Sequence, residues 1–316
     1  MSIWEAEAGE RADFFGAWTD VPRSYENLVN GGMTVNAAIK IIGDDGLPKP
    51  AKARRGQGAM FGPGPGSGSW STHEVIGGLG TSASINVALC AVLLAPEHQG
   101  DLNDYWLDRI AHAAYLMGNE VIGILGGKQD EYASVFGGFN CFRFRSDGKV
   151  EVERLNVTQS MVDFLETHLV LFDTDESRLS SRIHEEVWGN LDHSLSIMKD
   201  MIEFANIGRD AMLRGDIVIF AECLRQTCES QFRLNSTIGS KRIVEALDAL
   251  YTEDVILAAK VCGAGGGGAL EALAKEDEAD SVKAILGKLG YGRVLDWQFD
   301  FEGLKVWKMD HPRRTG

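Results

Sequence analysis

The chain has 316 residues, which is more than one ordinary hydrophobic core holds and suits two compact domains. Its hydrophobic content of 44% and charged content of 24% are typical of a soluble globular protein. The net charge of −15, with no basic run to offset it, argues against a general nucleic-acid binder but allows a local anion site.

The cysteines and the longest apolar run indicate whether the chain holds a metal site or spans a membrane. The five cysteines are widely spaced and form no Cys-x-x-Cys pair, so we expect buried free thiols rather than a metal site. The longest apolar run, residues 85–95, is too short to span a bilayer, and we recognise no signal segment at the start. We therefore expect a cytoplasmic protein that has no membrane partner.

The first elements in chain order are predicted to be strands. Residues 3–15 contain alternating and aromatic positions, which is typical of a strand that runs into the glycine-containing loop behind it. Arg11 in this stretch and Asp20 after it are charges beside apolar neighbours, so each is either an ordinary surface charge or a site residue. Residues 33–42 form the next predicted strand.

Two glycine-containing loops follow. Residues 56–69 are rich in Gly, Pro and Ser and are interpreted as a loop or lid, with Arg54 and Arg55 at its edge either solvated or facing a substrate phosphate. Residues 77–82 form a glycine loop that ends in two hydroxyl residues and leads into a helix that is apolar on every side. This pattern suits a phosphate at a helix N-terminus, although an ordinary turn before a core helix has the same pattern.

Two carboxylates follow a predicted helix over residues 102–117. Glu120, a glycine break and then Asp130 at the start of another helix form a layout in which one carboxylate could hold a metal and the other accept a proton. The alternative is that Asp130 only caps its helix. After a predicted strand pair over residues 139–155 we place the domain boundary, which gives domains 1–155 and 156–316.

The second half is predicted to combine helices and strands. Amphipathic helices are expected between residues 177 and 232. The four consecutive glycines at 265–268 lie between apolar segments, which predicts a backbone loop pressed against a ligand or another loop. A helix over 281–289 and strands over 293–301 and 304–309 are expected to complete an α+β second domain.

Three stretches resemble, in chain order, the three motifs of the GHMP kinases, the family of galactokinase, homoserine kinase, mevalonate kinase and phosphomevalonate kinase. They are Gly9-Glu-Arg-Ala-Asp-Phe-Phe-Gly-Ala-Trp-Thr-Asp20, Gly78-Leu-Gly-Thr-Ser-Ala83 and Gly263-Ala-Gly-Gly-Gly-Gly268. Each motif is weak to moderate alone, but three in order over nearly the whole chain are a strong signal. The resemblance implies an α+β fold with an N-terminal domain containing a left-handed βαβ unit and a ferredoxin-like C-terminal domain, with ATP and substrate in the cleft between them.

The resemblance also implies roles for individual residues. Ser82 and Glu120 would hold Mg²⁺. Asp130 would accept the proton of the substrate hydroxyl, and Arg11 would stabilise the transferring phosphoryl group of ATP. The implied ATP-binding residues are Gly77, Gly78, Leu79, Gly80, Thr81, Ser82 and Ala83. The implied substrate-binding residues are Asp20, Trp18, Thr19, Gly127, Gly265 and Gly266.

Two branches of the family are similar to different parts of the chain. The run 126–133, followed by 136–140, resembles the branch that contains heptose 7-phosphate kinase, whereas 18–22 resembles the kinase part of L-fucokinase. Both imply transfer of the ATP γ-phosphate to the anomeric hydroxyl of a sugar or sugar phosphate. A phosphorylated sugar would need cations far from Asp130. The candidates are Arg54, Arg55 and Arg178.

One departure from the family lies before the second motif, where Glu74-Val-Ile-Gly77 replaces the usual Pro-x-Gly-Ser, so the Glu74 carboxylate has to point away from a triphosphate. Two alternatives stay open: another small-molecule kinase of the family, and a non-catalytic sugar or nucleotide sensor on the same fold. The presence of Glu120 and Asp130 favours an enzyme, and an aromatic Trp18 beside Asp20 favours a sugar. A homodimer is also left open.

Overall fold

The structure of the chain is a computed structural model that describes residues 3–56, 69–72, 74–97, 102–123, 125–176 and 180–309. The loop expected over 56–69 lies almost entirely outside these residues, and so does Arg178.

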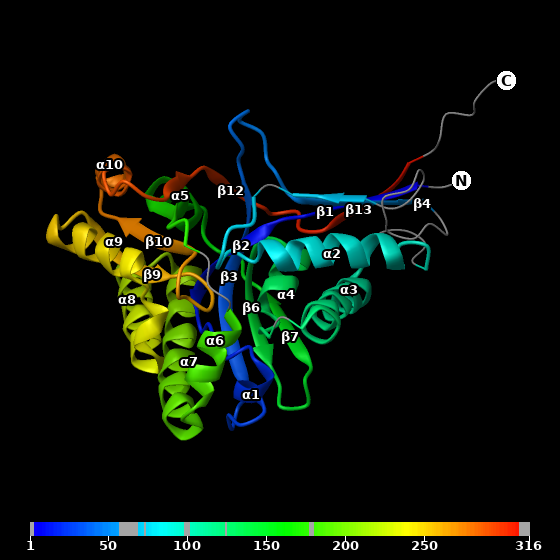
Figure 1. Cartoon of the computed structure of the whole chain (residues 1–316), viewed down its shortest axis with the longest axis horizontal. Coiled ribbons are helices and arrows are strands. Elements are labelled where there is room, and N and C mark those ends of the chain that lie inside the picture. The colour runs from blue at the N-terminus through cyan, green and yellow to red at the C-terminus, as the bar shows by residue number, and fades with distance from the viewer. Residues whose placement is uncertain are drawn as a thin grey trace.

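Three antiparallel sheets form the framework of the described residues (Figure 1). Their strand orders are β13-β1-β4-β5, β11-β8-β10-β9 and β12-β3-β6-β7, and β2 also pairs with β3. In chain order the strands are β1 (Ile3–Ala8), β2 (Glu10–Phe15), β3 (Gly32–Ile41), β4 (Ala51–Gly56), β5 (Ser69–Ser71), β6 (Phe139–Phe144), β7 (Val150–Arg154), β8 (Leu169–Asp173), β9 (Ile256–Val261), β10 (Ala269–Ala274), β11 (Arg293–Leu295), β12 (Trp297–Phe299) and β13 (Lys305–Met309).

Helices pack against these sheets in two groups (Figure 1). The helix predicted to be apolar on every side is α2, which packs against β1, β4, α3 and α4. In the second group α7 packs along α8, and α8 contacts β9. In chain order the helices are α1 (Pro22–Tyr25), α2 (Thr81–Leu94), α3 (Asp104–Leu116), the π-helix η1 (Met117–Ile122), α4 (Gln129–Phe136), α5 (Gln159–His168), α6 (Ser180–Trp188), α7 (Leu191–Arg214), α8 (Ile217–Leu234), the 3-10 helix η2 (Ser236–Ile238), α9 (Lys241–Thr252) and α10 (Ala279–Gly287).

The single strand predicted over residues 3–15 is wrong, because this stretch forms two strands in different sheets. β1 pairs with β4 and β13, whereas β2 pairs with β3. The division falls at Gly9, which lies so close to β3 that a Cβ atom there would stand 2.5 Å from the carbonyl oxygen of Ile39. A side chain at Gly9 would therefore push this part of the chain away from β3.

The last two strands do not complete a second domain as expected. β12 pairs with β3 and β13 pairs with β1, so the end of the chain returns to the sheets of the first half. Phe299 on β12 packs against Phe139, with 4.7 Å between the ring centroids. Alternation along a strand shows which face is buried but does not show which strand lies beside it.

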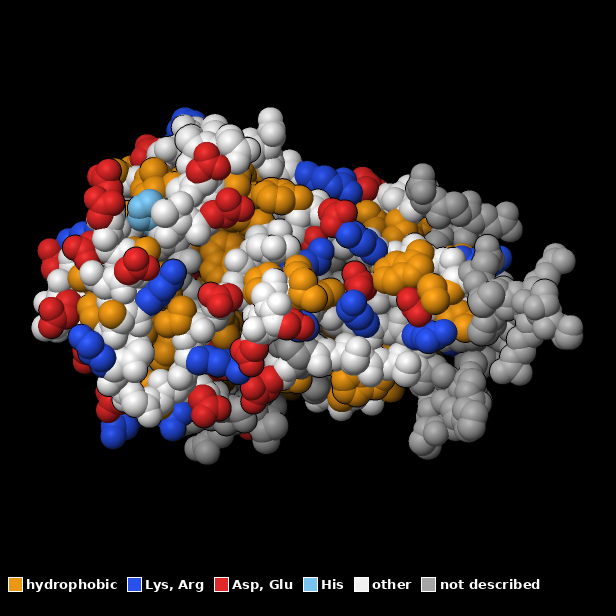
Figure 2. Space-filling model, turned by 90° about the horizontal axis from the view of Figure 1, so that it is seen from above, with side chains coloured by type: hydrophobic (Ala, Val, Ile, Leu, Met, Phe, Trp, Pro, Cys, Tyr) orange, Lys and Arg blue, Asp and Glu red, His pale blue; other side chains and the backbone are white. Residues whose placement is uncertain are grey.

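The α+β class is confirmed, because helices and antiparallel strands are both present in each half. The division into 1–155 and 156–316 stays a prediction, with residues 297–309 added to the sheets of the first part. All five cysteines are buried and free, as expected. No helix among the described residues combines the length and apolar character needed to cross a bilayer. Acidic and basic side chains are interspersed over the face shown in Figure 2.

A cluster of buried charges joins the two halves of the chain. Lys260 on β9 is fully buried, and its Nζ lies 3.4 Å from carboxylate oxygens of both Asp13 on β2 and Glu271 on β10. Burial alone would lower the pKa of Lys260, but the two carboxylates raise it above its usual value, so the side chain stays cationic. Burial raises the pKa of Glu271 to about 7, against the opposing effect of Lys260. We call Asp13, Lys260 and Glu271 the buried charge cluster.

Replacement of Lys260 by Met is expected to lower the free energy of unfolding by about 3–5 kcal/mol, because it leaves buried carboxylates without a cation. Urea unfolding of wild type and variant measures this difference. The control is Lys275→Met, since Lys275 is 35% exposed and pairs with Asp254 at the surface. That change should cost less than about 1 kcal/mol, and equal losses in the two variants would contradict a special role for the buried cation.

Candidate active site

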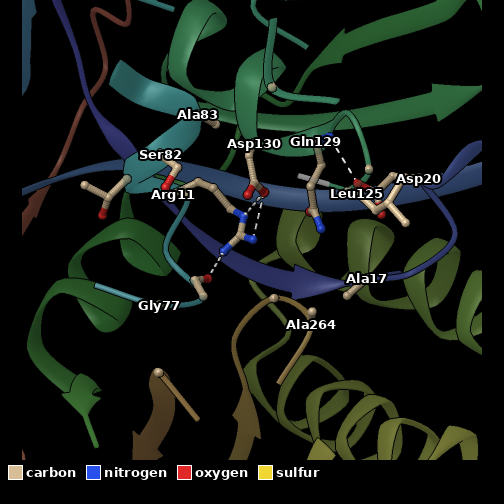
Figure 3. A pocket seen from close by; sticks show the side chains of 18 of the residues that line it. Arg11, Ala17, Asp20, Gly77, Ser82, Ala83, Leu125, Gln129, Asp130 and Ala264 are labelled. Carbon is tan, nitrogen blue, oxygen red and sulfur yellow. Dashed lines mark hydrogen bonds and ion pairs between the residues drawn. The ribbon is translucent and has the colours of Figure 1, made fainter. Parts of the chain in front are cut away.

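A cavity of about 410 Å³ is lined by residues from both halves of the chain. Its wall combines the end of the first motif, the glycine loop before α2, the start of α4 and the glycine loop between β9 and β10. Figure 3 shows the part of this cavity around Arg11, Asp130 and Asp20. Most of the residues predicted to form a site therefore meet at one place.

The two glycine loops lie backbone against backbone at one side of the cavity. A Cβ atom at Gly78 would stand 2.5 Å from the carbonyl oxygen of Cys262, and one at Gly268 would stand 2.4 Å from that of Gly77. The N–H of Ala269 donates a hydrogen bond to the carbonyl oxygen of Gly77 at 2.8 Å. The expectation that the second loop is pressed against another loop is confirmed.

The N-terminus of α2 opens onto the cavity. Its N-cap is Gly80, which has a left-handed φ of 81° and makes no side-chain cap hydrogen bond. Ser82 and Ala83 in the first turn line the cavity. A helix N-terminus carries N–H donors without helical partners and a partial positive charge, which favour a bound phosphate. Leu79 is fully buried instead, and its carbonyl oxygen accepts from the N–H of Arg11 at 3.0 Å.

Arg11 connects the glycine loop to Asp130 (Figure 3). Its Nε donates to the Asp130 carboxylate at 2.9 Å and its Nη2 lies 2.8 Å from the same oxygen, while Nη1 donates to the carbonyl oxygen of Gly78. Burial alone would lower the pKa of Arg11, but the carboxylates of Asp130 and Asp13 raise it above its usual value. Because the Asp130 side chain is 31% exposed, this buried cation holds a carboxylate that a ligand can reach.

Asp20 is a buried carboxyl group on the same cavity. Its Oδ2 accepts from the N–H of Gln129 at 3.1 Å, and it lies against Gly127, where any Cβ atom would overlap the carboxylate. Burial first, and then the charge of Asp130, raise the pKa of Asp20 to about 7. Near neutral pH this group can therefore either accept a hydrogen bond or donate one.

The other predicted substrate-binding residues divide into two groups. Trp18 and Gly265 line the cavity. Thr19 is not among the lining residues, because its buried hydroxyl is bonded to backbone atoms of Gly16 and Met33. Gly266 also does not line the cavity, and a Cβ atom there would stand 2.2 Å from the side chain of Ile183. Thr19 and Gly266 therefore support the cavity wall from behind and do not face the cavity.

The predicted metal ligands are not brought together. Ser82 lines the cavity, whereas Glu120 is exposed on η1 and is not among the lining residues. Besides Asp20, the cavity wall contains a second buried carboxyl group, that of Glu131, whose Oε2 has no hydrogen-bond partner among the described residues. Burial, followed by the charge of Asp130, raises the pKa of Glu131 well above its usual value. Ser82 and Glu131 offer oxygen atoms, the ligand type that Mg²⁺ takes together with phosphate or water oxygens, and Glu131 would have to lose its proton to bind the metal.

Glu74, Arg54 and Arg55, which were considered as neighbours of a nucleotide or substrate phosphate, do not line the cavity. The Glu74 carboxylate accepts from Nη2 of Arg293 at 3.0 Å and does not line the cavity, so the condition set for it by a bound triphosphate is met. Arg54 on β4 lies 3.3 Å from the Glu5 carboxylate, and neither it nor Arg55 lines the cavity. A role for this arginine pair in binding a substrate phosphate is therefore not supported.

Several polar residues on the cavity wall were given no role from the sequence, among them Gln129, Glu131 and His184. Gln129 and Glu131 flank Asp130, so their position next to a candidate base was the available signal. His184 lies on α6 next to Ile183, in a segment for which the sequence predicts only an amphipathic helix. No motif marks it as a site residue.

Comparisons with known proteins show what the chain is similar to. A family model described as "GHMP kinases C terminal" matches residues 209–292. A protein of Campylobacter jejuni named D-glycero-alpha-D-manno-heptose 7-phosphate kinase is 32% identical over 203 residues, which make up 63% of this chain. The match spans 59% of the length of that relative.

Solved structures share the fold over nearly the whole chain. A D-glycero-D-manno-heptose 1-phosphate kinase from Bacteriodes thetaiotaomicron has a TM-score of 0.73 and 22% identity, covering 98% of this chain and 100% of that one. The galactokinase of Lactococcus lactis, complexed with galactose, has a TM-score of 0.67 and 15% identity, covering 97% and 95%. The resemblance to the GHMP kinases that the three motifs predicted is confirmed.

The Asp20 carboxyl group is expected to titrate near pH 7, and replacement of Asp130 by Asn should lower its pKa, because one nearby negative charge is lost while burial remains. Carbon-13 NMR of labelled aspartate measures both titrations, with Asp20→Asn to assign the signal. Asp248→Asn, a change at an exposed position on α9, is the control and should leave the pKa unchanged. An Asp20 pKa that is the same in the Asp130 variant would contradict the coupling.

Proposed function

We propose that this chain is a member of the GHMP kinases and acts as a sugar kinase, transferring the γ-phosphate of ATP to the anomeric hydroxyl of a sugar or sugar phosphate. The observation that carries the proposal is the Arg11–Asp130 pair, which joins a reachable carboxylate to the glycine loop at the open N-terminus of α2. A phosphate bound at that N-terminus would have a buried cation and a proton acceptor beside it. The similarity to a heptose 7-phosphate kinase supports a sugar substrate.

Among the protein's own groups, the backbone N–H groups of α2 and the Arg11 side chain would bind the triphosphate. The N–H groups of the first turn of α2 would donate to phosphate oxygens, and Gly77 and Gly78 allow the ligand to approach the backbone closely. Arg11 would stabilise negative charge on the phosphoryl group as it moves, since its surroundings keep it cationic. Its bonds to Gly78 and Asp130 hold it in place before the ligand arrives.

Transfer then requires an acceptor oxygen in line with the γ-phosphorus. The sugar oxygen forms the new bond to phosphorus while the bond from phosphorus to the bridging oxygen of ADP breaks, and the hydroxyl proton moves to Asp130. A positioned base of this kind contributes about 10²- to 10⁴-fold to the rate. The products are ADP and the phosphorylated sugar.

Mg²⁺ would be held by Ser82 and a carboxylate, and when bound it neutralises charge on the triphosphate. The resemblance assigns this carboxylate to Glu120, which follows the cavity-lining residues Gly118 and Asn119 and has an exposed side chain. Glu131 is the alternative carboxylate ligand, since it lines the cavity.

A screen for ADP release over hexoses, heptoses and their terminal phosphates, followed by phosphorus NMR of the product, tests the proposed function. We expect activity on a heptose 7-phosphate or a fucose-like sugar and a phosphorus signal from an anomeric phosphate. Activity only on homoserine, mevalonate or another non-sugar would overturn the sugar assignment. Binding of sugar or nucleotide without any turnover would favour a sensor.

Replacement of Asp130 by Asn is expected to lower kcat by at least about 100-fold, because the group that accepts the hydroxyl proton is lost. ATP affinity should change little. Steady-state kinetics and calorimetric titration with ATP measure the two effects, and circular dichroism checks the fold. Asp248→Asn serves as the matched control at an exposed position. Near-normal turnover by a folded Asp130 variant would remove this residue from the catalytic role.

Replacement of Glu120 by Gln is expected to raise the magnesium concentration needed for half-maximal activity, because one of the ligands of the metal is weakened. Glu131→Gln provides the comparison, and magnesium titrations of activity at fixed ATP measure both variants. An unchanged titration for Glu120→Gln together with a shifted one for Glu131→Gln would assign the metal carboxylate to Glu131.

A further inference from the structure

Besides Glu131, three side chains in the cavity wall carry a buried polar atom without a hydrogen-bond partner in the described residues: Nε1 of Trp18, Oε1 of Gln129 and Nδ1 of His184. Their side chains belong to residues that are 3%, 4% and 4% exposed. An unpaired buried polar group is destabilising, so native proteins rarely leave several of them together. Three such atoms around one cavity indicate a ligand that pairs with them.

The three side chains surround the Asp20 end of the cavity. Trp18 precedes Asp20 by two residues, and the backbone N–H of Gln129 donates to the Asp20 carboxylate. The His184 ring, on α6, lies 4.7 Å from the Trp18 ring between centroids. Figure 3 shows the Gln129 side chain between Asp130 and Asp20, pointing into the cavity.

The backbone of Trp18 is strained in the way that binding sites often are. Its φ of 76° lies in the left-handed region, which is unfavourable for a residue with a side chain. Such conformations persist where surrounding contacts fix them, and they concentrate at ligand sites. The Trp18 carbonyl oxygen accepts from the Ser24 hydroxyl at 2.5 Å, which is one of the contacts that hold this turn.

The three atoms differ in hydrogen-bonding chemistry. The indole Nε1 of Trp18 only donates, Oε1 of Gln129 only accepts, and the Nδ1 of a neutral histidine does either according to its tautomer. Burial lowers the pKa of His184 to about 4, so the ring is neutral at physiological pH. A ligand that satisfies all of them needs both donors and acceptors, and a hydroxyl group supplies both.

We propose that Trp18, Gln129 and His184 form a hydroxyl subsite that binds the uncharged ring of the sugar, with His184 as a specificity-determining residue. This rests on the proposed function in that the ligand is the sugar to be phosphorylated. The subsite lies beside Asp20, so ring hydroxyls bound there leave another hydroxyl to face Asp130.

Charge in the cavity excludes a phosphate from the hydroxyl subsite. The carboxylates of Asp20, Glu131 and Glu176 line the cavity. Within the described part of its wall the one Lys or Arg is Arg11, which is already bonded to Asp130. A dianionic phosphate in this subsite would have no cation of its own to pair with and would be repelled by each of these acidic groups that is ionised, whereas neutral hydroxyls meet neither cost. A terminal phosphate on the substrate therefore lies outside this subsite.

Replacement of His184 by Phe tests the proposal, because Phe keeps the ring and removes both nitrogens. We expect affinity for the sugar to fall about tenfold, as for the loss of one buried hydrogen bond, while ATP affinity stays unchanged. His184→Asn places a polar atom near Nδ1 and should restore most of the affinity. Calorimetric titrations without ATP use L-fucose and D-glycero-D-manno-heptose 7-phosphate as probes. His193→Phe, at an exposed position on α7, is the matched control.

A second readout separates recognition from structural support. Wild type should bind L-fucose or the heptose more tightly than at least one monodeoxy analogue, and His184→Phe should lose that difference. A loss of affinity that is equal for the sugar and all of its deoxy analogues would overturn recognition by His184. Turnover of a sugar with the same KM in wild type and His184→Phe would overturn the subsite and leave the proposed function standing. If wild type neither binds nor phosphorylates any sugar, the proposed function fails, and the subsite fails with it.

Discussion

The site depends on the buried cation Lys260, which fixes β2 against β9 and β10. Asp13 on β2 lies beside Lys260 and also accepts from the N–H of Gly263, the first residue of the second glycine loop. Arg11 lies two residues earlier on the same strand, and residues two apart on a strand share a face. A shift of β2 would therefore separate buried charges as well as move Arg11. The contacts of Lys260 therefore help to fix the position of Arg11, the cation on the cavity wall.

The two glycine loops need strands that hold them in place. Glycine allows the backbones to approach where any Cβ atom would collide, as at Gly78 and Gly268, but it also loses the most conformational freedom on folding. The strands on either side hold the second loop, with Val261 paired to Leu270 in the β9–β10 ladder. The loops then present N–H groups rather than side chains to the cavity, which suits an anionic ligand whose charge is spread over several oxygens.

The parts of the fold and the site that follow from local pattern could be predicted from the sequence. The apolar helix α2, the glycine loop and the Asp130 position depend on residues close together in the chain. The division of residues 3–15 at Gly9 could not be predicted, because it depends on how closely the distant strand β3 approaches. The return of β12 and β13 to the first sheets could not be predicted for the same kind of reason, since alternation does not name the partner strand.

Side-chain direction limited the prediction of the site. Thr19 lies in the first motif, but its hydroxyl is used inside the turn, and Glu120 lies at the expected spacing with its side chain in solvent. His184 belongs to no motif and Gln129 only to the run 126–133, which gives it no role, so their unpaired polar atoms become visible only in the structure. A motif names residue types in order, whereas contacts with distant segments decide which side chains reach a ligand.

A crystal structure with a non-hydrolysable ATP analogue and a sugar would locate both ligands relative to Arg11 and Asp130. We expect the γ-phosphate at the N-terminus of α2, within hydrogen-bond reach of Arg11, and one sugar hydroxyl facing Asp130. A triphosphate bound away from residues 77–82, or an Arg11 that contacts no phosphate oxygen, would contradict this expectation.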